Sequence, residues 1–292
     1  MILVAGAGFL GGRLLADLAA DGVPCVGLTL SADRAAELEA SLGIRVLAAD
    51  LGDAGALRGA LDQLEERPDR VFHCASSNRG GAEAYRRVFV EGTRHLIELI
   101  QPERFLFSSS TSVYRQTDGS RVDEGSPTEP KAETGRLLLE GEALAAGAKS
   151  HGILRLGGLY GPGRAFVLQR LLEGRATIDH PPEGGRWLNQ IHVADAASAA
   201  RFLLEHEACG VFNVVDGNAY QQTEVYEKIA PRFGVPLPAH AEPRLDGKRG
   251  WTHKEVMADR LLALGWKPKF PDWLSALDAD PELVPSILKR VG

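Results

Sequence analysis

The chain has 292 residues, of which 44% are hydrophobic, 25% charged and 7% aromatic, as in ordinary globular proteins rather than disordered or collagen-like chains. Its 33 basic and 39 acidic residues give a net charge of −6, which leaves no basic surplus for binding a nucleic acid. The three cysteines lack zinc or disulfide spacing, and no apolar run approaches the roughly 20 residues of a membrane span. We therefore expect a soluble cytoplasmic protein that binds no nucleic acid, membrane or metal.

Short apolar segments alternate with amphipathic ones in the first half, which is the pattern of βαβ units around a parallel sheet. Strands are predicted at 1–5, 24–29, 44–48, 69–74, 103–108 and 151–156, and helices at 10–21, 32–42, 53–65, 82–100 and 133–147. The predicted fold is α/β, with a Rossmann-type doubly wound parallel sheet.

Turn-rich segments interrupt this rhythm after about residue 157. We predict a first domain at 1–157, to which sheet elements return from later in the chain, and a smaller α/β lobe at 158–292. The lobe is expected to hold a strand at 211–215 and helices at 164–174, 193–206, 222–233, 254–264 and 281–290.

A glycine-rich turn follows the first predicted strand and opens the first helix. Gly6, Gly8 and Gly11 form the pattern G-x-G-x-x-G. In this context the glycines permit a tight turn, a close approach of a pyrophosphate and close helix packing, while the helix N-terminus faces the anion. The turn therefore predicts a dinucleotide site in residues 1–157; the alternative is a glycine-rich turn without a ligand.

The end of the second strand bears on the choice between NAD and NADP. It carries no carboxylate for the ribose of NAD, whereas Ser31 and Arg34 are within reach of a 2′-phosphate. We favour NADP over NAD, with a solvated Arg34 as the alternative. Asp50 ends the third strand and is predicted to accept a hydrogen bond from the adenine amino group; the alternative is an acid that supports the start of the next helix.

Several further motifs, in order, give the chain its resemblance to the short-chain dehydrogenase/reductase superfamily. They are Phe72-His73-Cys74-Ala75-Ser76, Ser108-Ser109-Ser110-Thr111-Ser112-Val113-Tyr114, Tyr160-Gly161-Pro162-Gly163, Ile191-His192-Val193-Ala194-Asp195 and Leu264-Gly265-Trp266-Lys267-Pro268. The chain is most similar to NAD-dependent epimerases and dehydratases of nucleotide sugars. The resemblance implies a substrate lobe at 158–292 and further NAD(P) contacts from Phe9, Leu10, Leu51, Ala75, Ser76, Ser108 and Arg136.

The catalytic pair of that family is incomplete here. The family has Tyr-x-x-x-Lys on the helix after the serine segment, usually with a Glu four residues beyond the Lys. Matching that Glu to Glu140 puts Arg136 in the lysine position and Ala132 in the tyrosine position. A guanidinium stays protonated, so Arg136 cannot serve as a titrating base. The pattern resembles atypical subfamilies that keep the fold but lack the usual active-site tetrad.

The remaining candidates follow from family position. Ser110 would hydrogen-bond the reacting oxygen, with Tyr114, a water or a substrate group supplying the proton, and Tyr160, Asn189 and His192 are the predicted substrate contacts. We expect an oxidoreductase or epimerase acting on a hydroxyl- or keto-bearing small molecule, such as a nucleotide sugar. The alternative is a non-catalytic NAD(P)H-sensing protein. Helices 82–100 and 133–147 correspond to those that pair in many family dimers, so a homodimer is a candidate assembly.

Overall fold

The structure is a computed structural model that describes residues 1–77, 80–243 and 251–291. It divides into two compact units: unit 1 holds residues 1–113, 130–155 and 197–212, and unit 2 holds 114–129, 156–196 and 213–292. The prediction placed a boundary at residue 157 and expected sheet elements to return from later in the chain. Residues 197–212 belong to unit 1, and residues 114–129 belong to unit 2.

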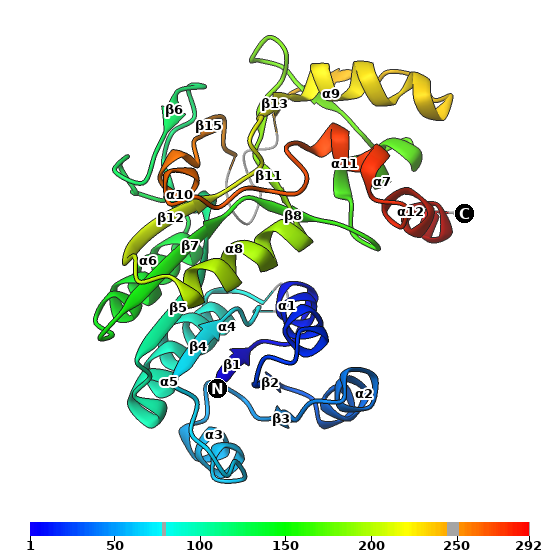
Figure 1. Cartoon of the computed structure of the whole chain (residues 1–292). Coiled ribbons are helices and arrows are strands. Elements are labelled where there is room, and N and C mark those ends of the chain that lie inside the picture. The colour runs from blue at the N-terminus through cyan, green and yellow to red at the C-terminus, as the bar shows by residue number, and fades with distance from the viewer. Residues whose placement is uncertain (78–79, 244–250, 292) are drawn as a thin grey trace. The chain divides into compact units, whose positions relative to one another are not determined.

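A seven-stranded sheet organises unit 1 (Figure 1). Its order is β12 (Gly210–Val214), β7 (His151–Leu156), β5 (Arg104–Ser110), β4 (Arg70–His73), β1 (Ile2–Ala5), β2 (Cys25–Thr29) and β3 (Val46–Ala48). The β1–β2, β2–β3, β1–β4 and β4–β5 pairs are parallel. The doubly wound fold and its six strands are confirmed, and the strand predicted at 211–215 returns to the sheet as its edge.

Helices of unit 1 form two groups on this sheet. α1 (Phe9–Ala20) contacts α2 (Ala32–Leu42), whereas α5 (Gly92–Ile100) contacts α3 (Ala54–Leu61) and α6 (Glu133–Ala146). Local chemistry sets their ends: the Ser31 side chain caps α2 and the Asp53 side chain caps α3. Gly43 ends α2 with φ 66°, a left-handed conformation that favours glycine.

The helix predicted at 82–100 is interrupted. It consists of α4 (Ala82–Tyr85), a π-helix η1 (Arg86–Glu91) and α5. A π-turn displaces carbonyl groups from the regular α-helical pattern, and two of them find side-chain donors: His73 Nε2 lies 3.0 Å from the Val88 carbonyl oxygen, and Thr93 Oγ1 lies 2.6 Å from that of Phe89. His73 is a core residue, and burial lowers its pKa to about 4.

Unit 2 is built from short elements. Its strands are β6 (Arg121–Val122), β8 (Gly158–Tyr160), β9 (Ile178–Asp179), β10 (Trp187–Leu188), β11 (Gln190–His192), β13 (Tyr220–Gln221), β14 (His240–Ala241) and β15 (Glu255–Val256). Its helices are α7 (Phe166–Leu172), α9 (Gln222–Ile229), α10 (Asp259–Ala263), α11 (Trp273–Ala279) and α12 (Leu283–Val291), and α8 (Val193–Glu205) crosses the boundary between the units.

Two predictions for unit 2 are corrected. The segment 254–264 is helical only from Asp259, because its first residues pair as β15 with β6. Helix α11, which begins after Pro271 and is capped by Asp272, was not predicted.

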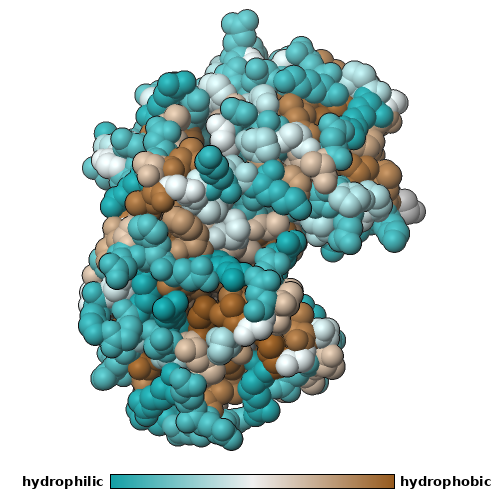
Figure 2. All heavy atoms as spheres, viewed as in Figure 1, coloured by the Kyte–Doolittle hydropathy of each residue, from teal (hydrophilic) through white to brown (hydrophobic). Residues whose placement is uncertain are grey.

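Hydrophilic residues predominate on the face shown in Figure 2. The large apolar side chains that are exposed lie apart in the sequence, at Leu30, Phe166, Leu237, Leu262 and Leu288. Among the described residues, no helix has the length and apolar character to cross a bilayer.

Candidate functional site

The turn between β1 and α1 depends on its glycines. Gly6 has φ 115°, and a Cβ there would lie 2.3 Å from the Ala75 backbone nitrogen. A Cβ on Gly11 would lie 2.2 Å from the Gly6 carbonyl oxygen. Gly6 and Gly11 therefore permit the tight turn and the close helix that the sequence predicted.

Gly8 differs from these two, because a Cβ there would meet no heavy atom of the described residues within 4 Å. It is the N-cap of α1, and neither a side-chain cap nor an acidic residue occupies the first turn. The positive end of the helix dipole thus faces an open side, and no acidic side chain of that turn neutralises it. This arrangement fits the diphosphate of a dinucleotide.

The residues predicted for the adenosine end have partners within unit 1. The Ser31 hydroxyl accepts a hydrogen bond from the Arg34 amide at 3.4 Å, and the Arg34 guanidinium pairs with Glu37 at 2.9 Å. Both side chains of that ion pair are exposed, and such pairs contribute little stability. Arg34 can therefore be recruited by a phosphate at small cost.

Asp50 lies just beyond β3, at the carboxyl edge of the sheet. One of its oxygens accepts from the Gly52 amide at 2.8 Å, and the other from the Arg87 guanidinium at 2.9 Å. Partial burial would raise the pKa of Asp50, but the hydrogen bonds from Arg87 and Gly52 outweigh it and lower that pKa. The carboxylate is ionised and still presents acceptor lone pairs, so an adenine contact stays a prediction.

β1 and β4 are sheet neighbours, and the strand order reverses at β1. Ligands of open α/β sheets bind at such switch points, next to the carboxyl ends of the strands. Ala75 and Ser76 follow β4 there. Ser108 and Ser110 end β5, and the Ser110 Oγ accepts from the Ser112 amide at 3.2 Å.

The residues predicted for the tyrosine and lysine positions lie at the start and on the exposed side of α6. Ala132 is the N-cap and lies outside the helix, with ψ 138°. Arg136 is exposed and donates to the Lys131 carbonyl at 3.4 Å, and Glu140 is an exposed partner of Arg86. Ala132 is half-buried outside the helix, and Arg136 and Glu140 are exposed, so this frame does not follow the buried face of the helix.

Glu142 is the acidic residue on the inner face. It is 5% exposed and pairs with Arg155 at 2.7 Å. Steps of four residues back from it reach Leu138 and Thr134, both buried, on the same face. Thr134, Leu138 and Glu142 therefore share the inner face of α6, and neither Thr134 nor Leu138 supplies a group that titrates near neutral pH.

Tyr114 does not supply the missing phenol. It is 1% exposed, belongs to unit 2 and donates its hydroxyl proton to Asn213 Oδ1 at 2.7 Å. The Asn213 amide in turn donates to the Met257 carbonyl at 2.9 Å. We therefore withdraw Tyr114 as a proton donor and assign it to the core of unit 2.

The three predicted substrate contacts also have structural roles in unit 2. The Asn189 side chain bonds the Lys254 carbonyl and the Val256 amide, both at 2.8 Å. The buried His192 ring lies 3.1 Å from Asp280. Tyr160 is 1% exposed beside His192, and burial, together with the nearby carboxylates, raises the pKa of its hydroxyl. We do not propose these side chains for substrate binding.

Two buried ionisable residues of unit 2 were not predicted. Lys254 is 2% exposed and donates to the Tyr114 carbonyl at 3.0 Å, and burial lowers its pKa to about 8. Asp216 is 6% exposed, with no hydrogen-bond partner of good geometry for either carboxylate oxygen among the described residues, and burial raises its pKa. Neither sits in a motif, so only the fold reveals them.

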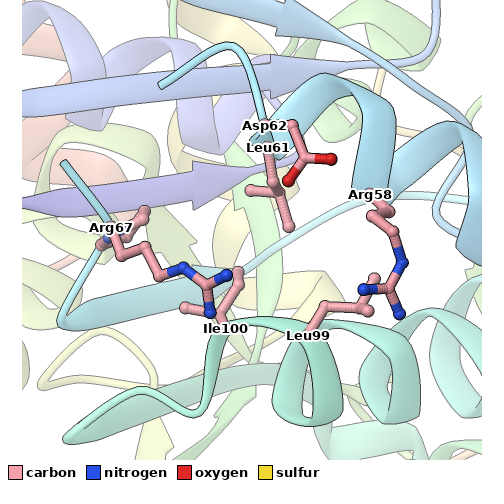
Figure 3. A pocket seen from close by; sticks show the side chains of 7 residues that line it. Arg58, Leu61, Asp62, Arg67, Leu99 and Ile100 are labelled. Carbon is pink, nitrogen blue, oxygen red and sulfur yellow. The ribbon is translucent and has the colours of Figure 1, made fainter. Parts of the chain in front are cut away.

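A surface pocket lies elsewhere in unit 1. Figure 3 shows Arg58 and Arg67 on either side of an apolar floor that includes Leu61, Leu99 and Ile100. Pro68 and Ile100 precede β4 and β5, so this pocket is at the amino edge of those strands, away from the glycine turn. Within the described ranges no cluster of three His, Cys, Asp or Glu side chains could hold a metal.

Comparison with known proteins identifies relatives over most of the chain. A profile of the NAD dependent epimerase/dehydratase family matches residues 2–215. A curated relative from Streptomyces sp, named 3-diazoavenalumate denitrifying reductase, is 34% identical over 94% of this chain and 98% of its own length. A UDP-glucose 4-epimerase from Halalkalibacterium halodurans is 27% identical over 70% of this chain and 72% of its own.

Solved structures agree on the fold. UDP-glucose 4-epimerase from Thermus thermophilus, solved in complex with NAD, superposes with a TM-score of 0.79 at 22% identity and covers 99% of each chain. At that identity the likeness concerns the fold alone.

Proposed function

Because the chain belongs to the NAD dependent epimerase/dehydratase family, we propose that it is a pyridine-nucleotide-dependent reductase of an electrophilic small molecule. The observation that carries the proposal is the inner face of α6, where Thr134 and Leu138 are buried at four-residue steps before Glu142. We assign these two residues to the tyrosine and lysine positions of the family. A reaction that takes a proton from a substrate alcohol needs a group that titrates near neutral pH. A hydride acceptor that needs no protein proton makes no such demand.

Residues of unit 1 would hold the nucleotide. The glycine turn and the N-terminus of α1 would bind its diphosphate, with Asp50 at the adenine. When bound in its reduced form, the nucleotide supplies a hydride. The chain's own residues then have to orient the acceptor, and Ser110 suits that role because its Oγ accepts from Ser112 and keeps its own proton to donate.

We further propose NADP rather than NAD as the preferred nucleotide. β2 ends in Thr29 and is followed by Leu30 and Ser31, so no carboxylate stands there to repel a 2′-phosphate. Arg34 would exchange its exposed partner Glu37 for the phosphate.

The proposed substrate class follows from the lack of a tyrosine hydroxyl on the inner face of α6. The name of the Streptomyces relative indicates reductive loss of a diazo group. When hydrogen replaces an aryl diazonium group, a hydride forms the new C–H bond, the C–N bond breaks and dinitrogen leaves. The charge balances without a proton from the protein. Aryl diazo compounds are therefore the first substrates to test.

The test incubates the protein with NADPH or NADH and three substrate groups: aryl diazo carboxylates, activated ketones and nucleotide sugars. We expect consumption of NADPH with an aryl diazo compound and little or none with a ketone, because reduction of a ketone to an alcohol needs a proton, and we expect a lower kcat in Ser110→Ala. A nucleotide sugar epimerised with no net use of nucleotide would contradict the proposal. Tight NADPH binding without turnover in any group would instead support the sensing alternative.

A further inference from the structure

Three buried polar side chains join three elements of unit 1. The Ser109 hydroxyl of β5 donates to Glu142 Oε1 on α6 at 2.5 Å. Arg155 of β7 donates to both oxygens of the same carboxylate, with Nε 3.1 Å from Oε1 and Nη2 2.7 Å from Oε2. Ser109, Glu142 and Arg155 are 6%, 5% and 5% exposed. We name this set the Glu142 clamp.

Stability alone is a weak reason for such a set. A buried ion pair gives up hydration, and well-packed apolar side chains of equal volume often do as well or better. What the ion pair does supply is geometry, because the two guanidinium bonds and the serine bond admit only one arrangement of the carboxylate. The clamp therefore fixes α6 relative to β5 and β7.

Ser109 is the middle residue of the serine segment. Side chains alternate along a strand, so Ser108 and Ser110 point to the opposite face from Ser109. The burial pattern agrees, since Ser109 is buried and its two neighbours are half-buried. Holding Ser109 through its hydroxyl thus fixes the rotation of the strand end that carries Ser110.

α6 also comes unusually close to its neighbours beside the clamp. A Cβ on Gly141 would lie 2.6 Å from the Phe89 carbonyl oxygen and 2.8 Å from the Phe107 ring. The helix can neither lift nor rotate at Gly141 without breaking the Glu142 contacts. The first turn of α6, with Thr134, is thereby held on the same face.

We propose that Glu142 is a positioning residue, which acts through Ser109 and Arg155 to set the Ser110 hydroxyl and the first turn of α6 in the arrangement that orients the hydride acceptor. This inference rests on the proposed reductase function. It adds a residue that touches neither nucleotide nor substrate.

The experiment compares Ser109→Ala, Ser109→Thr and Glu142→Gln with a matched control, Thr93→Ala. Thr93 is a fully buried hydroxyl of unit 1 that donates to Phe89 at 2.6 Å and lies outside the clamp. We measure kcat, KM, the NADPH dissociation constant and amide hydrogen exchange of the full chain. Ser109→Ala should lower kcat about tenfold or more, since small misplacements of reacting groups are costly, with NADPH affinity unchanged.

Ser109→Thr should restore most of kcat, because it restores the donor. Glu142→Gln keeps the shape but loses the charge and should lower kcat further, provided that it folds. Thr93→Ala should lose thermal stability like Ser109→Ala and keep its kcat. Hydrogen exchange should quicken in Ser109→Ala at residues 108–112 and 133–136 and stay unchanged in β1 and β2.

The outcomes separate the two proposals. If the wild-type protein shows no turnover, the proposed reductase function is wrong. The hydrogen-exchange rates then still test whether the Glu142 clamp orders the two segments. If Ser109→Ala exchanged amide hydrogens at residues 108–112 and 133–136 as slowly as the wild type, the role of the Glu142 clamp would be overturned. It would also be overturned if Thr93→Ala lowered kcat as much as Ser109→Ala does.

Discussion

Two glycines of one turn should respond differently to a methyl group. At Gly8 a Cβ meets nothing within 4 Å among the described residues, so Gly8→Ala should fold, at a cost of about 1 kcal/mol for a poorer N-cap. The methyl group would stand where a diphosphate approaches the helix, and NADPH affinity should fall about tenfold or more. Calorimetric titration and thermal unfolding measure the two effects.

The matched control is Gly6→Ala. There the φ of 115° and a Cβ 2.3 Å from the Ala75 nitrogen predict a severe loss of stability. A Gly8→Ala protein that binds NADPH like the wild type would refute the diphosphate assignment.

Asp216 is a residue whose charge opposes folding. Burial raises its native pKa above the ordinary value of about 3.9, and the Asp195 carboxylate adds to the shift. As pH rises above about 4, the unfolded chain loses this proton first, so stability falls until the native pKa is passed. Asp216→Asn carries no charge and should raise the thermal midpoint by about 2 °C or more at pH 8, and less at pH 5. Parallel curves of midpoint against pH for the two proteins would disprove this.

The role of a residue could be predicted only where the residues that it contacts are close to it in the sequence. The spacing of Gly6, Gly8 and Gly11 identified the turn, because its geometry is made by consecutive residues. The role of Tyr114 was not predictable, since its partner Asn213 is 99 positions away. The same holds for Ser109 and Glu142, which the fold brings together from two elements.

At the scale of elements, burial beneath the π-helix η1 makes one histidine sensitive to acid, although its hydrogen bond to the Val88 carbonyl partly opposes the effect. His73 contacts the Val88 carbonyl that η1 releases, and burial lowers its pKa to about 4. The unfolded chain binds the proton below about pH 6.5 and the native protein only near pH 4. Stability should therefore fall by about 3 kcal/mol as pH drops across that window.

Urea unfolding at pH 7 and pH 4.5 measures this loss, with His73→Phe as the comparison. Phenylalanine keeps the ring contacts with Phe89 and Phe107 but cannot bind a proton. If His73→Phe loses as much stability on acidification as the wild type, His73 is not the cause.

The extent of α6 was predicted to within a residue at each end, but its inner face was not. The helical period alone leaves two frames, one through Ala132, Arg136 and Glu140 and one through Thr134, Leu138 and Glu142. Only burial selects the second frame. Since Arg136 is exposed on the other face, Arg136→Ala should keep the NADPH dissociation constant within about twofold of the wild type. A larger loss would restore Arg136 as a cofactor ligand.

For the whole molecule, the alternation of strands and helices predicted the sheet, because each βαβ unit is contiguous in sequence. It did not predict which later segments belong to unit 1. Residues 197–212 belong to unit 1, whereas residues 114–129 belong to unit 2. The reason is that segments far along the chain can pair with the open edge of the sheet and cover its apolar side chains. The predicted boundary at 157, with sheet elements returning later, describes the sequence pattern but not the full extent of the compact units.

This difference predicts how fragments behave. Arg104 is 6% exposed, and its guanidinium donates to the carbonyls of Leu203 and Ala208 at 2.8 and 2.7 Å. A fragment 1–157 lacks both acceptors and the edge strand β12, so Arg104 keeps only Ser150 as an acceptor, at 2.7 Å, and its two hydrogen bonds to those carbonyls are lost, which is strongly destabilising. We expect it to be unfolded or aggregated by circular dichroism and size-exclusion chromatography. A fragment 1–157 in which Arg104→Met removes the cation should aggregate less, and a cooperatively folded 1–157 with Arg104 intact would show that residues 197–212 are dispensable for unit 1.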